Sequence, residues 1–419
     1  MKTPFHIISL LLSVFILAGV KAADETPPAS PVRERVLEQM RGTEARIDGI
    51  ELYAVQVDAE RRFSYAVQKD RQHVFIRFMA AGKSGWDEIA LPAGKPGESV
   101  AQRLTRLDWY REFKGKTLFE AINYLVEQRS KRNRAELEHA EMAVLDLAGR
   151  LLDKPTTELL GLTGTTPVPG LYCILSDDPQ MVRKEAVRAL EQNLRTHLKV
   201  KLYGKPAVDQ AVVRAAREVF GKTAYVAGDV NMGYRHAADN APVDDVVAAM
   251  IALRDLGLDA CEDPAEMSND QWAQVQERIG AMSLIPDVPL RPAWKSRVAL
   301  DPRMGRIYNM HPSCMGSIIE MVELSKVIRA NGKKLMVGDA SLVGTGCPAW
   351  EQLAIGMGAD WVEAIEKPQE NDVFQRCTVR NPVQRTADGK FGVKQLLPGF
   401  GVEIDDKKLK TLSCGFLSL

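Results

Sequence analysis

The chain has 419 residues, enough for two domains or for one large barrel with a cap. Apolar residues make up 45% and charged residues 26%, which is ordinary for a globular protein. Lysine plus arginine equals aspartate plus glutamate at 55 each, so no excess charge favours nucleic acid or an anionic membrane as a partner.

The first 22 residues differ from the rest. Lys2 precedes an almost wholly apolar run from Phe5 to Val20, and a small-residue cleavage site ends at Ala22. The pattern predicts a secretory signal peptide over residues 1–22, export to the periplasm, and no membrane contact after cleavage. An uncleaved anchor is the alternative, although the apolar run is short for a membrane span. Residues 23–43, which begin rich in proline and acid, are predicted to form a linker.

Residues 44–160 are predicted to form an α+β capping domain. Apolar and polar residues alternate over 47–55 and 74–78, as in an antiparallel sheet. Apolar residues then recur at helical spacing over 107–125 and 135–152.

Over residues 161–390 strands and helices alternate, which predicts a (β/α)8 barrel and thus an α/β fold. The predicted strands are 169–175, 197–203, 224–229, 259–262, 282–287, 306–310, 334–338 and 361–365. Amphipathic helices fit between most of these strands, and the fifth connection, 293–300, is the weakest link in the alternation. A doubly wound open sheet is the alternative, but no glycine-rich phosphate fingerprint follows the first strand. Residues 391–419 are predicted to return to the capping domain.

Charged residues stand at the carboxyl ends of these strands, which meet at one mouth of a barrel. Their intervals are close to the roughly 30 residues of one βα unit. The candidates are Lys199, Lys201, Asp229, Glu262, Asp287, His311, Asp339 and Glu366. Each alone also has a structural interpretation, such as a solvated lysine face, turn chemistry or a helix cap. Their joint position favours a functional site.

The residue types indicate a metal site that faces a lysine base. Asp229, Glu262 and Asp287 would be three hard oxygen ligands on adjacent strands, which suits Mg²⁺. Burial near the metal and near Lys199 would lower the pKa of Lys201, as a lysine base requires. His311 is the candidate second acid or base, and Asp339 could accept from its ring.

At these residues the chain resembles the enolase superfamily, in particular the mandelate racemase/muconate lactonizing enzyme group. The resemblance extends from about residue 45 to residue 409 and includes Gly85-Trp-Asp-Glu88 and Lys199-Val-Lys201. It continues with Asp229-Val-Asn231 and Glu262-Asp-Pro264. It implies an α+β cap on a modified TIM barrel, Mg²⁺, a small carboxylate substrate and a homo-oligomer. Lys201 would be the base, Lys199 its support, and Asp229 and Glu262 the first two metal ligands.

Three departures from the family pattern bear on function. The third ligand is expected at Asp287, although a local match would put Ala293 and Trp294 there and leave no ligand. The sixth strand ends in Asn309-Met-His311, where the family usually has Lys or Asp. Racemase-like members pair an Asp on the sixth strand with a His on the seventh. Here His311 follows the sixth strand and Asp339 the seventh, so the two residues of the dyad would be exchanged.

These features predict an exported enzyme that abstracts the proton α to a carboxylate, with dehydration of an acid sugar as the expected reaction. One lysine base and a histidine acid suit the loss of a β-hydroxyl. A racemase or epimerase is the enzymatic alternative. A barrel that binds a carboxylate without turnover is the non-enzymatic one. The six cysteines lie far apart without metal-ligand spacing, and no disulfide is assigned.

Overall fold

The computed structural model describes residues 29–57, 61–62, 64, 67–68, 71–91, 94, 97–235, 242–363 and 372–419. The predicted signal peptide and Glu366 lie outside these residues, so both stay predictions. None of the described helices is long and apolar enough to span a membrane.

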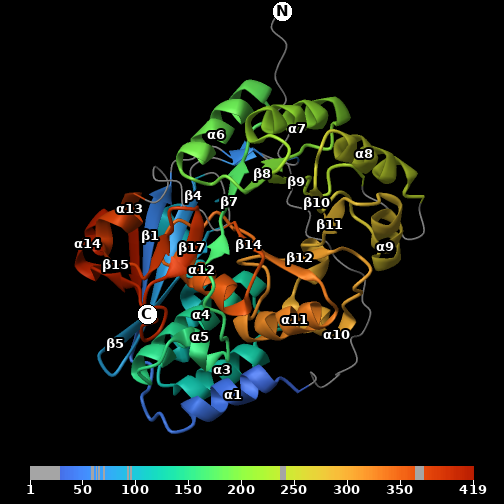
Figure 1. Ribbon diagram of the computed structural model, residues 1–419. Helices are drawn as coiled ribbons and strands as arrows, with labels where there is room; N and C mark the ends of the chain where they lie inside the picture. The colour runs from blue at the N-terminus through green and yellow to red at the C-terminus, as the bar shows by residue number, and fades with distance from the viewer. Residues whose placement is uncertain are drawn as a thin grey trace, which may run out of the picture.

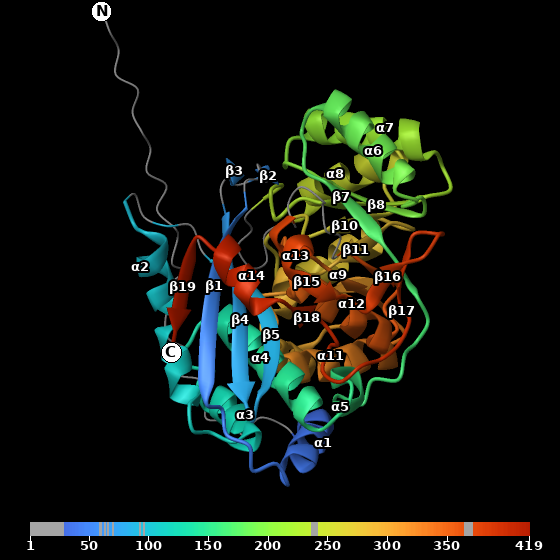
Figure 2. The same ribbon diagram turned by 90° about the vertical axis from the view of Figure 1, so that its left-hand side faces the viewer.

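The capping domain is built on a four-stranded antiparallel sheet with the order β19-β1-β4-β5. Its strands are β1 (Gly49–Val57), β4 (Arg71–Ala80), β5 (Lys83–Ala90) and β19 (Gly415–Ser418). Figure 2 shows β19, from the far end of the chain, beside β1. The C-terminal residues therefore complete the sheet that the N-terminal residues begin. A two-stranded hairpin, β2 (Arg61–Arg62) with β3 (Val67–Gln68), lies between β1 and β4 in sequence.

Helices cover one face of this sheet. They are α2 (Val100–Leu104), α3 (Leu118–Glu127), α4 (Arg134–Leu151) and α5 (Thr156–Leu159), with a 3₁₀ helix η1 (Thr105–Phe113). The single helix predicted over 107–125 is therefore wrong. Gly115 adopts φ +81° between η1 and α3, and Thr117 caps α3 by accepting from the Glu120 amide.

The predicted linker contains a helix, α1 (Pro31–Met40), so that prediction is wrong over these residues. Ser30 caps the helix, and Pro31 occupies its first turn, where a missing amide costs nothing. Val32, Val36 and Met40 share one buried face. Their spacing of four residues is typical of one helix face, but the signal directly follows a polar stretch and was missed.

The barrel strands form two parallel sheets that close into one ring. The first has the order β11-β10-β9-β8-β7 and the second β12-β13-β14. The two sheets meet at two places. At one of them the backbone amide of Asn309 donates to the Pro286 carbonyl, and at the other a parallel bridge joins Gly170 to Val362. The strands are β7 (Leu171–Ile174), β8 (His197–Lys201), β9 (Tyr225–Asp229), β10 (Ala260–Glu262), β11 (Ser283–Ile285), β12 (Ile307–Met310), β13 (Lys334–Val337) and β14 (Trp361–Val362). The predicted α/β fold, a barrel with an α+β cap, is confirmed.

Helices surround the ring in Figure 1. They are α6 (Pro179–Glu191), α7 (Pro206–Phe220), α8 (Asp244–Asp255), α9 (Asn269–Arg278), α10 (Ala293–Ala299), α11 (Ile318–Ala330) and α12 (Gly346–Met357), with a 3₁₀ turn η2 (Val288–Leu290) before α10. Short elements from two parts of the chain lie beside the cap and barrel. These are β6 (Val168–Pro169), α13 (Asp372–Cys377), β15 (Thr378–Arg380), β16 (Val383–Arg385), β17 (Lys390–Val393), β18 (Glu403–Ile404) and α14 (Asp406–Leu412). The two parts meet where β6 pairs with β17.

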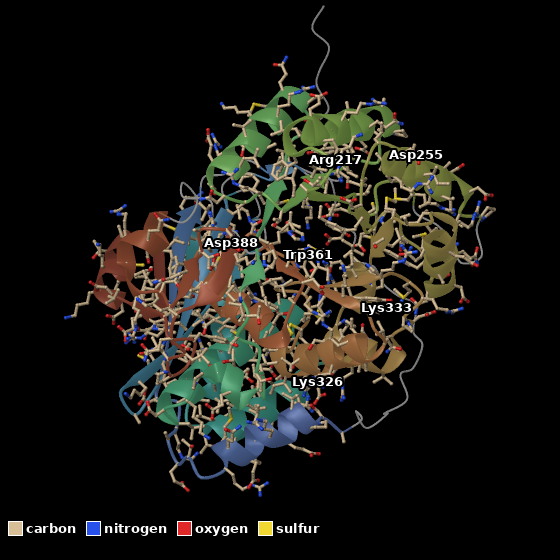
Figure 3. All side chains as sticks on the ribbon, viewed as in Figure 1. Arg217, Asp255, Lys326, Lys333, Trp361 and Asp388 are labelled. Atoms are coloured by element: carbon tan, nitrogen blue, oxygen red, sulfur yellow. The ribbon has the colours of Figure 1, made fainter. Side chains whose placement is uncertain are left out.

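A layer of apolar side chains fills the barrel interior. It consists of Leu171, Ala227, Ala260, Ile285, Ile307, Met336 and Trp361. Figure 3 shows Trp361 inside the ring. Because side chains on a strand alternate with a period of two, the residue two positions further along each strand also faces inward, at the carboxyl end. These residues include Asp229, Glu262, Asp287, Asn309 and Glu363.

Candidate functional site

The site begins with three residues in register on adjacent strands. Lys201 of β8 lies opposite Asp229 of β9, and Asp229 lies opposite Glu262 of β10. All three side chains are buried. The barrel thus brings an amine and two carboxylates together at the carboxyl ends of its strands.

Lys201 is held as a cation. Its Nζ donates to Asp229 in a short hydrogen bond and to the Asn231 side-chain oxygen at 3.0 Å. Burial, the largest single effect, would lower the lysine pKa, but neighbouring acidic groups, with Asp229 first among them, together raise it above its usual value. Conversely, Lys201 and Lys199 hold the pKa of Asp229 below its usual value despite burial. The expected lowering of the Lys201 pKa assumed a metal ion beside the amine and stays a prediction.

Lys199 lies deeper and bridges carboxylates. Its Nζ is 2.8 Å from Glu262 Oε2, 2.5 Å from Glu363 Oε2 and 3.8 Å from Asp229 Oδ2. Burial raises the pKa of Glu262 to about 7, although Lys199 opposes the shift. The charge of Lys199 between three carboxylates offsets part of the cost of burying them inside the barrel.

Glu363 was missed by the sequence analysis, which chose Glu366 as the charged residue of the eighth strand. The strand β14 ends at Val362, three residues earlier than predicted. Strand periodicity could have indicated Glu363. If Trp361 points into the barrel, Glu363, two residues later, is the next residue that points the same way.

Asn309 occupies the end of the sixth strand. Its Nδ2 donates to Glu262 Oε1 at 2.7 Å, and the side chain is fully buried. A Cβ on Gly338 of the neighbouring strand would lie 2.7 Å from Asn309 Oδ1, so the glycine leaves room for this amide. Asn309 can orient Glu262 but cannot transfer a proton at neutral pH.

Asp287 follows β11 by two residues and is buried. Arg291 donates to it through two nitrogens, with Nε 2.9 Å from Oδ1 and a short contact from Nη2 to Oδ2. The Asp263 carboxylate accepts from the backbone amides of Asp287 and Val288 at 3.1 and 3.2 Å. Ala293, the alternative at this position, instead begins α10.

His311 lies one residue beyond β12. Burial, the largest single effect, would lower its pKa, but Asp287 and Cys314 together raise the pKa to about 10. Its Nδ1 lies 2.7 Å from the Pro312 carbonyl oxygen, whereas Asp339 Oδ1 accepts from the Leu342 amide at 3.1 Å. The charge partner of His311 is thus Asp287, and the swapped His311–Asp339 dyad is not the arrangement found.

The carboxylates match magnesium in residue type but not in arrangement. Asp229, Glu262 and Asp287 each accept from an internal cation: Lys201, Lys199 and Arg291 respectively. Within the described ranges, no three His, Cys, Asp or Glu side chains form a group that could hold a metal ion. In this arrangement the residues do not fit a magnesium ion bound by three carboxylates.

The cap holds the loops around the mouth through buried acidic residues. Glu88 accepts from the amides of Val343 and Gly344 at 2.8 and 2.6 Å. Glu138 accepts from the amides of Ser313 and Gly316 at 2.6 and 2.8 Å. The loops after β13 and β12 are therefore fixed by the cap.

Asp87, His139 and Ser313 lie in the order of a nucleophilic triad. His139 is 2.7 Å from the Asp87 carboxylate through Nδ1 and 2.7 Å from Ser313 Oγ through Nε2. The Ser313 amide, however, donates to Glu138, so a carboxylate takes the donor that an oxyanion would need. This chain of hydrogen bonds ties the cap to the loop that carries His311.

Comparison with known proteins gives a family. The family model described as "Enolase C-terminal domain-like" matches residues 181–408. N-succinylamino acid racemase of Thermus thermophilus is 25% identical over 385 residues, 86% of this chain and 94% of that protein. Muconate cycloisomerase 1 of Acinetobacter baylyi is 23% identical over 279 residues, 65% of this chain and 71% of that protein.

Solved structures share the fold. Dipeptide epimerase from Cytophaga hutchinsonii, complexed with Mg and the dipeptide D-Ala-L-Val, has a TM-score of 0.75 at 17% identity and covers 89% of this chain and 99% of its own. Muconate lactonizing enzyme from Pseudomonas fluorescens has a TM-score of 0.72 at 20% identity, with coverage of 88% and 99%. At such identities the likeness concerns the fold.

Proposed function

The chain belongs to the enolase superfamily, in its mandelate racemase/muconate lactonizing enzyme group, and from this membership we propose that it abstracts the proton α to the carboxylate of a small substrate. The observation that carries the proposal is Lys201, a buried amine at the barrel mouth positioned by Asp229 and Asn231. Its neighbours hold the amine at the barrel mouth, and this position supports the role of a base.

Lys201 must lose its proton before it can act. The ion pair with Asp229 opposes this loss, so a ligand or cation that draws Asp229 away would free the amine as a base. The α-proton then moves to Lys201 Nζ, and the electron pair of the C–H bond is left as an enolate. His311, protonated below about pH 10, can deliver a proton to the other side of the substrate.

Dehydration of a hydroxy acid such as an acid sugar is the first candidate reaction. The proton from His311 would join a β-hydroxyl, the C–O bond would break, and water would leave. The enol that remains would become a 2-keto acid. One lysine base and one histidine acid support this outcome, because Asn309 on the sixth strand offers no second base.

Racemisation or epimerisation is the second candidate. The relatives that favour it are N-succinylamino acid racemase and N-succinyl-L-Arg/Lys racemase. In this case His311 would return a proton to the same carbon from the opposite face.

Magnesium dependence, general in the superfamily, is carried over as part of the proposal. Asp229, Glu262 and Asp287 would be its ligands, and a bound divalent ion would stabilise the enolate charge. Because each of these carboxylates is paired with an internal cation, all three pairs would have to open before the ion could bind.

The test is deuterium exchange in D₂O. The protein is incubated with Mg²⁺ and a panel of acid sugars and N-acylamino acids, and α-deuterium uptake and 2-keto acid formation are measured together. A 2-keto product indicates dehydration, whereas deuterium in recovered substrate without that product indicates racemisation. We expect Lys201→Ala to lose about a hundredfold or more of either rate, the range for removal of a general base.

Lys326→Ala is the control, because Lys326 is exposed on α11, away from the mouth (Figure 3). Equal exchange rates in Lys201→Ala and the wild type would contradict the assignment of the base. No exchange with any substrate, together with binding of one, would support the non-catalytic carboxylate-binding alternative.

A further inference from the structure

The carboxylate of Asp287, the expected third metal ligand, is already bound to a cation of the protein. Both of its oxygens accept from Arg291, in the two-pronged geometry that planar guanidinium and carboxylate groups share. The side chains of Asp287 and Arg291 are 3% and 16% exposed. Little water competes for this pair.

The backbone around the pair is fixed as well. Asp287 and Arg291 flank the 3₁₀ turn η2, in which the Leu290 amide donates to the Asp287 carbonyl at 2.9 Å. Asp263 holds the amides of Asp287 and Val288 from the neighbouring strand end. The turn therefore presents the carboxylate directly to the guanidinium four residues later.

Arg291 differs in kind from the two lysines. Lys199 and Lys201 each carry a single nitrogen that can rotate, change partners or lose its proton. A guanidinium stays charged at every accessible pH and occupies two oxygens at once. Asp287 is thus the one predicted ligand that deprotonation of its partner cannot release.

We propose that Arg291 is a tethered cation that competes with a divalent metal ion for Asp287, and so holds the site in a state of low metal affinity. The inference rests on the proposed function, which places the ion among Asp229, Glu262 and Asp287. A divalent ion needs a free carboxylate oxygen and is repelled by a positive charge beside it. Metal binding at this position therefore requires the guanidinium to leave Asp287.

Calorimetric titration of the full chain with Mg²⁺ tests the competition. We expect Arg291→Gln to bind Mg²⁺ about tenfold to a hundredfold more tightly than the wild type, the range expected for one charge-assisted hydrogen-bonded pair. The double variant Arg291→Gln/Asp287→Asn should lose this gain, because the released carboxylate is then absent.

The matched control is Arg150→Gln. Arg150 also pairs with an aspartate four residues away, Asp146, at nearly the same exposure (15% and 2%) but in the cap. Its Mg²⁺ affinity should equal that of the wild type. If Arg291→Gln does not fold, Arg291→Lys serves instead, because a single ammonium cannot hold both oxygens and affinity should still rise.

Two results would overturn the inference: no gain of affinity in the folded Arg291 variant, or a gain that persists without Asp287. Deuterium exchange separates this failure from failure of the proposed function. If α-deuterium exchange depends on Lys201 but Arg291→Gln gains no Mg²⁺ affinity, the competition is refuted and the proposed function stands. If Arg291→Gln gains Mg²⁺ affinity but no substrate shows α-deuterium exchange, the competition stands and the proposed function is refuted.

Discussion

His197 is a histidine that the fold keeps neutral. Its ring lies at the amino end of β8, with its centroid 5.2 Å from that of Trp361 and 5.7 Å from that of Tyr225. Burial lowers the pKa of His197 to about 4, and the charge of Lys334 adds to the effect. At neutral pH the ring therefore packs as an uncharged aromatic group in the barrel.

This shift predicts a loss of stability in acid. The unfolded chain protonates His197 near pH 6.5, whereas the folded chain does so only near pH 4, so the unfolded state takes up the proton first. Stability is therefore full above about pH 6.5 and falls as the pH decreases towards 4. We expect the wild type to lose roughly 2 to 3 kcal/mol more than His197→Gln between pH 7.5 and 4.5.

The measurement is urea unfolding at several pH values, followed by circular dichroism. Parallel pH profiles for the two proteins would show that His197 does not contribute. An NMR titration of the imidazole provides an independent check of the pKa.

At the level of single residues, strand periodicity predicted part of the site. Lys199, Lys201, Asp229 and Glu262 lie at strand ends as expected, because a period of two and a turn signal are local properties of the sequence. The pairing of Asp287 with Arg291 was not predicted. An acid and an arginine four residues apart are common on protein surfaces, and only the folded turn shows that this pair is buried.

Among the elements, β5 and α4 make an unusually close contact at Gly85. A Cβ added there would lie 2.2 Å from the Ala143 carbonyl oxygen and 2.4 Å from the Leu147 nitrogen. Both atoms belong to the backbone of α4, so no side-chain rotation can relieve the overlap. The glycine of the Gly85-Trp-Asp-Glu88 segment thus sets the distance between sheet and helix.

We expect Gly85→Ala to destabilise the protein by about 1 to 3 kcal/mol, the usual cost of overpacking. Gly42→Ala is the control, because a Cβ there has no neighbour within 4 Å. Thermal unfolding of both variants makes the comparison. A melting temperature for Gly85→Ala equal to that of Gly42→Ala would mean that the helix shifts at no cost.

The sequence predicted the types of the elements better than the contacts between distant parts of the chain. The eight barrel strands follow from local periodicity, whereas the short helix α10 over 293–299 stands in the connection whose pattern was weakest. The break between η1 and α3 was not predicted, because apolar residues continue at helical spacing across Gly115. The roles of Glu88 and Glu138 were also hidden, because the backbone amides that they bind lie more than 150 residues away in the sequence.

In the whole molecule, helix α1 is attached to the barrel by buried charges. Glu320 of α11 is fully buried and faces three arginines: Arg33 of α1, Arg129 after α3, and Arg297 of α10. Arg129 also stacks over the Trp294 ring at 4.8 Å. Beside it, Glu323 accepts from the Val32 amide at 2.6 Å. One carboxylate thus joins the N-terminal helix, the cap and two barrel helices.

Removing that carboxylate should loosen the whole assembly. Glu320→Gln would leave three guanidinium groups, exposed by 15%, 12% and 7%, without their shared partner. We expect a loss of about 3 to 5 kcal/mol, the cost of an uncompensated buried charge, and faster trypsin cleavage within α1. Glu218→Gln removes a carboxylate from an exposed pair with Arg183 and should leave both quantities unchanged. Equal unfolding midpoints and cleavage rates for the two variants would mean that apolar packing of α1, rather than Glu320, holds the N-terminal helix on the barrel.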